Sequence, residues 1–307
     1  MHAGPRHYHL VHRTTYTYPE PVTTSYGRAL LLPRTVGGQT CHWSELRTEP
    51  APAEIAEHRD FSGNRSSYFA VTDEHTVLEV VAESLLTVNR RVSQVGRIPA
   101  MPWEQVAHVT RSLRSTGAQT HVDHVSAVVP VTDGALTSPL VTVTHAARRY
   151  ADASFAPGRP VGHVIRNLTE RIYTDFTYRS GSTTVKTPLE EVFERRVGVC
   201  QDFAHVLIAC VRSMGLAARY VSGYIETRPP KGEPKLRGVD ASHAWAAVWL
   251  GDGIWLAFDP TNDQWQNDRY VTLAWGRDYG DVPPVKGVIF TEATHAELDV
   301  SVDVAPL

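Results

Sequence analysis

One thiol in this chain occupies a position that favours a nucleophile. Cys200 comes two residues after Gly198 and begins a run in which apolar residues recur at spacings of three and four. This spacing predicts a helix with a wide buried face from about Val199 to Met214, and Gly215 suits its left-handed end. Gly198 permits a tight turn before the helix. The free N–H groups and the positive dipole of a helix start favour a thiolate and can also hold an oxyanion.

A second cysteine in the same predicted helix provides a comparison. Cys210 lies among apolar neighbours in mid-helix, which is typical of an inert core residue. Cys200 differs because a glycine precedes it, polar residues (Gln201 and Asp202) follow it, and the helix begins around it. Cys200 is therefore the candidate nucleophile.

A hairpin further along the chain predicts two partners for this thiol. Residues 241–250 and 254–258 read as strands on either side of Gly-Asp-Gly. If the loop has three residues, Leu250 pairs with Ile254 and paired residue numbers sum to 504. His243 and Asp259 then lie diagonally on one face, roughly 7–8 Å apart at the backbone. A two-residue loop would place them on opposite faces.

The three residue types together predict acyl transfer. A lone histidine in a strand is more often structural, and a lone Asp-Pro is more often a turn. A shared face and an upstream helix-start cysteine favour a different hypothesis, in which His243 is the base of Cys200 and Asp259 orients the imidazole.

Metal binding is the weaker interpretation of the histidines. Cys200 and His205 are five residues apart, which places them on different faces of a helix. The histidines of the first strand (His2, His7, His9 and His12) have no carboxylate or cysteine at ligand spacing. His-Val-Asp-His at 121–124 is predicted as a solvated loop. We expect no metal and no organic cofactor, since there is also no phosphate-cradling Gly-rich loop.

Composition indicates an ordinary soluble globular protein. The chain has 307 residues, a formal net charge of −3, 42% hydrophobic and 21% charged residues. This balance favours neither nucleic acid nor a membrane as a partner, and no run of about 18 apolar residues occurs. Three sparse cysteines predict no disulfide framework, which favours a cytoplasmic location.

The order of elements predicts an α+β protein with two domains. Residues 1–95 are rich in short strands and turns, typical of a small β-sandwich. Residues 96–307 mix helices and strands and contain the candidate site. Ser138 as N-cap with Pro139 after it predicts a helix to about residue 151 or 153, and 228–240 is predicted as a loop near the site. The other expected elements are helices at 103–113, 162–176 and 187–195 and strands at 216–226 and 293–304.

Four segments together resemble the bacterial transglutaminase-like superfamily. They are Gly-Val-Cys-Gln-Asp-Phe-Ala-His at 198–205, Ala-Arg-Tyr-Val-Ser-Gly-Tyr at 218–224, Ala-Ser-His-Ala-Trp at 241–245 and Asp-Pro-Thr-Asn at 259–262. The β-rich first part is similar to the N-terminal region that accompanies this core. The resemblance implies a papain-like α+β core with Cys200, His243 and Asp259 as catalytic positions. It also implies thiol chemistry on amides of a peptide or protein substrate.

Two departures from the family pattern bear on the reaction. Many relatives carry an acidic residue shortly after His-Ala-Trp, where this chain has Ala246 and Ala247. Protein-crosslinking members use an upstream tryptophan to hold the oxyanion, but none lies between Trp103 and Trp245, and Tyr178 is the candidate substitute. These departures favour a peptidase or amidase acting through a thioester. The alternatives are a protein-glutamine γ-glutamyltransferase, crosslinking or deamidating, and a non-catalytic peptide-binding module.

Overall fold

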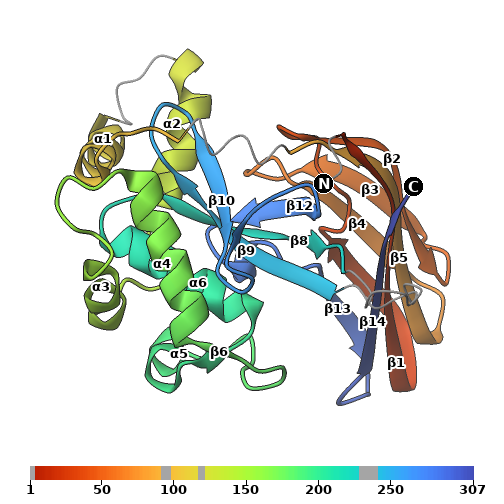
Figure 1. Ribbon diagram of the computed structural model, residues 1–307. Coiled ribbons are helices and arrows are strands. Elements are labelled where there is room, and N and C mark those ends of the chain that lie inside the picture. The colour runs from red at the N-terminus through yellow and green to blue at the C-terminus, as the bar shows by residue number, and fades with distance from the viewer. Residues whose placement is uncertain (1–3, 91–97, 117–121, 228–240) are drawn as a thin grey trace, which may run out of the picture.

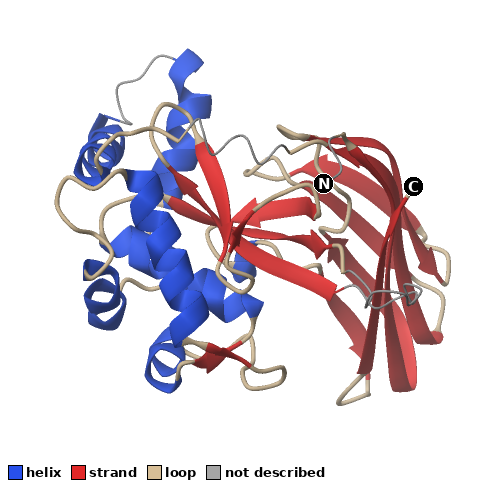
Figure 2. Ribbon diagram, in the orientation of Figure 1, coloured by secondary structure: helices blue, strands red, loops and turns tan. Residues whose placement is uncertain are grey.

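A computed structural model describes residues 4–90, 98–116, 122–227 and 241–307. The core sheet has five strands, and Figure 1 shows it between a group of helices and a second, curled sheet. Figure 2 shows that the helices gather on one side of the molecule and that the other side is almost entirely strand. Among the described residues, no helix has both the length and the apolar character needed to cross a membrane.

The curled sheet is built around one long strand, β1 (Arg6–Ala29). Its first half pairs with β5 and β14, and its second half pairs with β4 and β13, all antiparallel. The ladder with β5 breaks between Thr17 and Val22, where Pro19 and Pro21 have no N–H to donate. The other members are β2 (Gln39–Glu49), β3 (Glu54–Arg59), β4 (Arg65–Val71), β5 (His75–Val88), β13 (Val285–Thr291) and β14 (Glu297–Pro306).

The last two strands correct the expected domain division. The strand expected at 293–304 is present as β14, but it pairs with β1 rather than joining the core sheet. Residues 285–306 therefore belong to the N-terminal sheet, and a core of 96–307 is too long. Alternating apolar residues predict a strand but not its partner, and this partner lies at the other end of the chain. The expected small sandwich is one sheet that curls on itself (Figure 1).

The core sheet has the order β11-β10-β9-β8-β12. Trp255 pairs with Trp249 and Leu256 with Val248, so the predicted register, with paired numbers summing to 504, is confirmed. The loop at 251–253 has three residues, all with positive φ. The strands are β8 (Ala218–Ile225), β9 (Ala241–Trp249), β10 (Trp255–Asp259), β11 (Gln264–Trp265) and β12 (Tyr270–Gly276).

The central helix, α6 (Cys200–Ser213), is buried along most of its length and packs against β8 and β9. The helices expected at 103–113, 162–176 and 187–195 are confirmed, with shifts of at most three residues at their ends. The helices that surround α6 are α1 (Trp103–Thr116), α2 (Val122–Gly134), α3 (His145–Asp152), α4 (Val161–Asp175) and α5 (Leu189–Arg195).

Two local predictions in this region are wrong. The helix expected from Ser138 begins at His145, where the Thr144 side chain accepts from the N–H of Ala147. Ser138 instead lies in a tight turn, and its hydroxyl accepts from the buried Arg212 on α6. The loop expected at 121–124 overlaps the start of α2. Tertiary packing outweighed the local capping pattern in the first case.

Candidate active site

Cys200 is the first residue of α6, and a buried carboxylate fixes this helix start. Asp202 accepts from the N–H of Val199 at 2.8 Å and from the hydroxyl of Thr183 at 2.6 Å. A Cβ at Gly198 would lie 2.8 Å from Oδ2 and 2.9 Å from Cβ of Asp202. Gly198 is therefore required by the close approach of the capping side chain. This corrects the expectation of a tight turn, since Gly198 has no positive φ.

The two cysteines of α6 differ as expected. Cys200 is half-buried, whereas Cys210 is fully buried and its Sγ donates to the carbonyl of Ala147 at 3.5 Å. Burial raises the pKa of Cys210. Cys210 is thus a neutral core residue, and Cys200 is the thiol that a substrate can reach.

The structure brings His243 and Asp259 into contact on β9 and β10. Nε2 of His243 lies 2.7 Å from Oδ2 of Asp259, whose side chain is fully buried. Oδ1 of Asp259 accepts from the backbone N–H of Thr261 and of Asn262. Oδ2 also accepts from Nδ2 of Asn262 at 2.7 Å and from the hydroxyl of Tyr270 at 2.6 Å. Since Nε2 faces the carboxylate, Nδ1 is the nitrogen that remains for the thiol.

The electrostatics of this group favour a charged imidazole. Burial alone lowers the pKa of His243, but the hydrogen bond and charge of Asp259, then those of Cys200, raise it to about 10. Burial opposes ionisation of Asp259, yet His243 and the hydrogen bonds from Asn262 and Tyr270 lower its pKa below the ordinary value. At neutral pH the site therefore holds an imidazolium between a carboxylate and the sulfur of Cys200.

Tyr178, the candidate oxyanion donor, lies beside the start of α6. It belongs to β6 (Thr177–Tyr178), which pairs in parallel with β7 (Val197–Gly198), and Tyr178 is the partner of Gly198. Burial raises the pKa of Tyr178, and the charge of Cys200 contributes to this shift. The side chain remains 56% exposed, so its hydroxyl is accessible to a substrate.

Sequence reasoning missed the two side chains that hold Asp259. Asn262 belongs to the Asp-Pro-Thr-Asn segment, and its spacing after an aspartate is a turn signal that could have indicated the contact. Tyr270 lies on β12, which pairs with β8 across the sheet, so no local pattern could indicate its contact with Asp259.

The histidines set aside as metal ligands have other contacts. His205 is buried and accepts from the N–H of Tyr279, and His12 is buried against the hydroxyl of Tyr224. No cluster of three or more His, Cys, Asp or Glu side chains suited to a metal occurs within the described ranges. The loop predicted at 228–240, His2 and His121 lie outside the described residues.

Comparisons with known proteins match both halves of the chain. A model of the transglutaminase-like superfamily matches residues 148–260, and one of the bacterial transglutaminase-like N-terminal region matches residues 8–87. An uncharacterized protein of Mycobacterium tuberculosis is 45% identical over 99% of this chain and 94% of its own length. The chain belongs to the transglutaminase-like superfamily. An uncharacterized Mycobacterium leprae member is 31% identical over 97% of this chain and 98% of its length.

Two further similar proteins carry descriptions of activity. The solved structure of a "putative cysteine protease" from Cytophaga hutchinsonii covers 99% of this chain and 94% of its own, with a TM-score of 0.69 and 20% identity. At that identity the likeness concerns the fold, and it confirms the expected papain-like α+β core. A protein-glutamine gamma-glutamyltransferase of Pseudomonas aeruginosa is 35% identical over 103 residues, 31% of this chain and 15% of that protein.

Proposed function

We propose that this superfamily member is a thiol-dependent hydrolase of amide bonds, of the peptidase or amidase type. The observation that carries the proposal is the buried His243–Asp259 hydrogen bond of 2.7 Å, on an imidazole that also hydrogen-bonds Cys200. In this reading Cys200 is the nucleophile, His243 carries the proton and Asp259 fixes the imidazole.

The first half of the reaction forms a thioester. The Cys200 thiolate attacks the carbonyl carbon of the amide, and the carbonyl oxygen becomes an oxyanion. The backbone N–H groups at the start of α6 stabilise that oxygen, with the Tyr178 hydroxyl as a second donor. Such a donor is worth roughly 2.7–4 kcal/mol in the transition state. The His243 imidazolium then gives its proton to the amide nitrogen, the C–N bond breaks and an amine leaves.

The second half returns the enzyme to its starting state. Water enters, neutral His243 takes one of its protons, and the oxygen attacks the thioester carbon. The C–S bond breaks, a carboxylic acid leaves, and the thiolate again faces an imidazolium. Asp259 is held by four hydrogen-bond donors besides His243 (two backbone N–H groups, Asn262 and Tyr270), so it can orient the ring throughout without moving.

A transferase is the second candidate, favoured by the local similarity to the Pseudomonas aeruginosa gamma-glutamyltransferase. In a transferase, an amine would attack the thioester in place of water. In a deamidase, water would hydrolyse a thioester formed from a glutamine side chain. A non-catalytic peptide-binding module is a third candidate, and it would need no reactive thiol. The two enzymatic readings share the thioester and differ in their products.

The experiment that separates these readings uses purified full-length protein and a library of peptide amides that includes glutamine peptides. New peptide termini or free amine without crosslinks support the hydrolase, whereas ammonia with an isopeptide product supports the transferase. Cys200→Ala should abolish either product and leave the circular dichroism spectrum unchanged. Turnover that survives in Cys200→Ala would refute both enzymatic readings.

A further inference from the structure

A cavity of about 390 Å³ lies between the core sheet and the N-terminal sheet. Arg219, Ala247 and Ala257 are direct neighbours across β8, β9 and β10, so they share one face of the core sheet. All three line the cavity, together with Arg90 from the chain just after β5. The two alanines are small, which leaves open space beside the Arg219 side chain. The volume is in the range of sites for small organic ligands.

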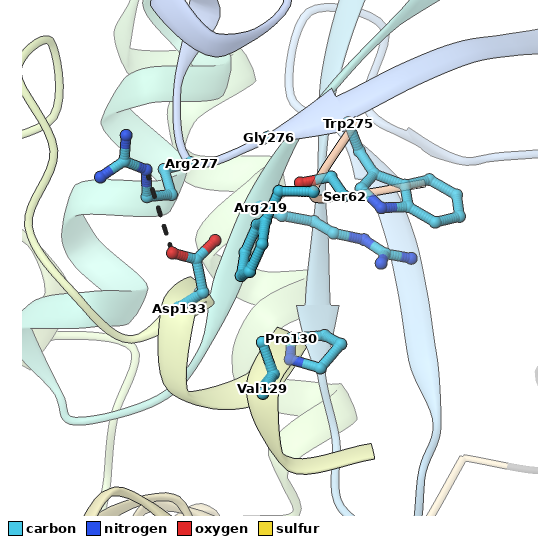
Figure 3. Close-up of a pocket in the computed structure, with 10 residues that line it drawn as sticks. Ser62, Val129, Pro130, Asp133, Arg219, Trp275, Gly276 and Arg277 are labelled. Atoms are coloured by element: carbon cyan, nitrogen blue, oxygen red, sulfur yellow. Dashed lines mark ion pairs between the residues drawn. The ribbon is translucent and has the colours of Figure 1, made fainter. Parts of the chain in front are cut away.

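Arg219 is held by aromatic faces rather than by a carboxylate. Its guanidinium carbon is 3.7 Å from the ring centre of Trp275 and 4.3 Å from that of Trp255. Arg34 lies 3.4 Å from the centre of Trp275, and two groups so close to one ring centre must occupy its opposite faces. Figure 3 shows Arg219 running beneath Trp275, while Asp133 is paired with Arg277.

Among the described residues, no carboxylate forms an ion pair with Arg219. Its Nε is buried without a hydrogen-bond partner in the part of the chain that the structure describes. Burial lowers the pKa of Arg219 to about 9, and the charge of Arg34 contributes. The guanidinium therefore remains charged at neutral pH on a half-buried side chain, so an anion that enters the cavity can pair with it.

The second arginine of the cavity donates to neutral groups in the part of the chain that the structure describes. Arg90 donates to the carbonyl of Tyr270, to Oε1 of Gln39 and to Oγ1 of Thr272. Burial lowers its pKa to about 10, so it too is charged at neutral pH. The Thr272 hydroxyl accepts from Arg90 and from Gln266, which leaves its own proton free to donate. Both cations and this hydroxyl line one cavity.

We propose that this cavity binds a small organic anion, whose carboxylate or phosphate oxygens pair with Arg219 and Arg90. Ala247 is the cross-strand neighbour of Arg219 and carries no charge, so the ligand supplies the negative charge beside the guanidinium. Ala247 is four residues from His243 on the same face of β9, roughly 13 Å along the strand. The site is therefore separate from the thiol and does not depend on the proposed hydrolysis.

Binding is tested on the full-length protein with citrate and inorganic phosphate as probes, at ionic strength held constant with sodium chloride. Tryptophan fluorescence reports binding at this cavity, since Trp255 and Trp275 contact Arg219. We expect a saturable fluorescence change and a Tm rise of roughly 5 °C at about 100 times Kd. A response to citrate alone assigns a carboxylate ligand, and a response to phosphate alone assigns a phosphate ligand. The absence of a saturable change with either probe would overturn the proposal.

Three variants assign the binding to this cavity. Arg219→Gln should weaken affinity by at least about tenfold. Ala247→Glu keeps both arginines and supplies an internal carboxylate, so it should raise the Tm without ligand and remove the response to citrate. Arg47→Gln, an equal charge change at a side chain 55% exposed, should bind as the native protein does. Native affinity in both cavity variants would refute the site, and binding that persists in Cys200→Ala separates it from the thiol chemistry.

Discussion

The hydroxyl of Tyr270 donates to the same oxygen of Asp259, Oδ2, that contacts His243. This hydrogen bond is 2.6 Å long and lowers the pKa of Asp259, so the carboxylate stays ionised beside the imidazole. Three elements of the core sheet thus meet at one carboxylate: β9 provides the histidine, β10 the aspartate and β12 the tyrosine.

Removal of the Tyr270 hydroxyl should affect the pH dependence of catalysis more than the stability of the fold. In Tyr270→Phe the pKa of Asp259 rises, so the acid limb of the kcat/KM profile should move to higher pH. We expect kcat/KM to fall by roughly tenfold, equivalent to about 1.4 kcal/mol, close to the lower end of the range for a hydrogen bond to a charged group. The exposed Tyr173→Phe is the matched control. An unchanged acid limb in Tyr270→Phe would show that this contact has no role in the reaction.

Asp259→Asn should preserve the shape of the site but lose the charge that selects the imidazole tautomer. For a triad of this kind the kcat loss is roughly 10³–10⁴-fold, larger than any effect on KM. Steady-state kinetics on whichever amide substrate is found provides the measurement. A loss below about tenfold would mean that Asp259 is structural only.

The protonated imidazole should make stability depend on alkaline pH. The pKa of His243 is about 10 in the folded protein, above its ordinary value of 6.5, so its stabilising contribution is complete below about pH 6.5. That contribution is lost as pH rises toward 10. The pKa of Asp259 is lowered, so its contribution is present above about pH 4 and lost as pH falls further. Thermal unfolding from pH 6 to 10 should show a steeper decline for the native protein than for His243→Gln. Parallel curves would contradict the charged pair.

Alkylation should distinguish the three cysteines. We expect iodoacetamide at pH 7 to modify Cys200 well before Cys41, although both are half-buried, because Cys200 contacts an imidazolium. Buried Cys210 should stay unmodified in the folded protein. Peptide mass spectrometry over time gives the three rates, and His243→Gln should slow Cys200 to the rate of Cys41. Equal rates for Cys200 and Cys41 in the native protein would count against an activated thiol.

The helix start that carries Cys200 can be tested by a double-mutant cycle. Asp202→Ala removes a capping side chain and should cost about 1 kcal/mol of unfolding free energy. Gly198→Ala places a methyl within 2.8 Å of the Asp202 carboxylate and should cost roughly 1–3 kcal/mol. Since the clash requires Asp202, Gly198→Ala should cost less when Asp202→Ala is already present. Additive costs in chemical denaturation would show that the two residues do not interact.

Local sequence patterns were sufficient to predict the parts of the site whose residues are close in sequence. The spacing of apolar residues placed Cys200 at a helix start, and the Gly-Asp-Gly turn set the hairpin register that unites His243 and Asp259. Both depend on contacts within about 20 residues, where backbone geometry leaves few alternatives. The left-handed Gly215 after α6 was predictable for the same reason.

Only the tertiary structure decided the contacts that join distant segments. Tyr270 contacts Asp259 because β12 pairs with β8. Ser138 accepts a hydrogen bond from Arg212 instead of capping a helix, and β14 pairs with β1. The setting of Arg219 likewise depends on which strands flank it and on the N-terminal sheet that lines the cavity. Apolar patterns specify which face of an element is buried, but not the element that covers it. That choice is made by how all the buried faces of the chain pack together.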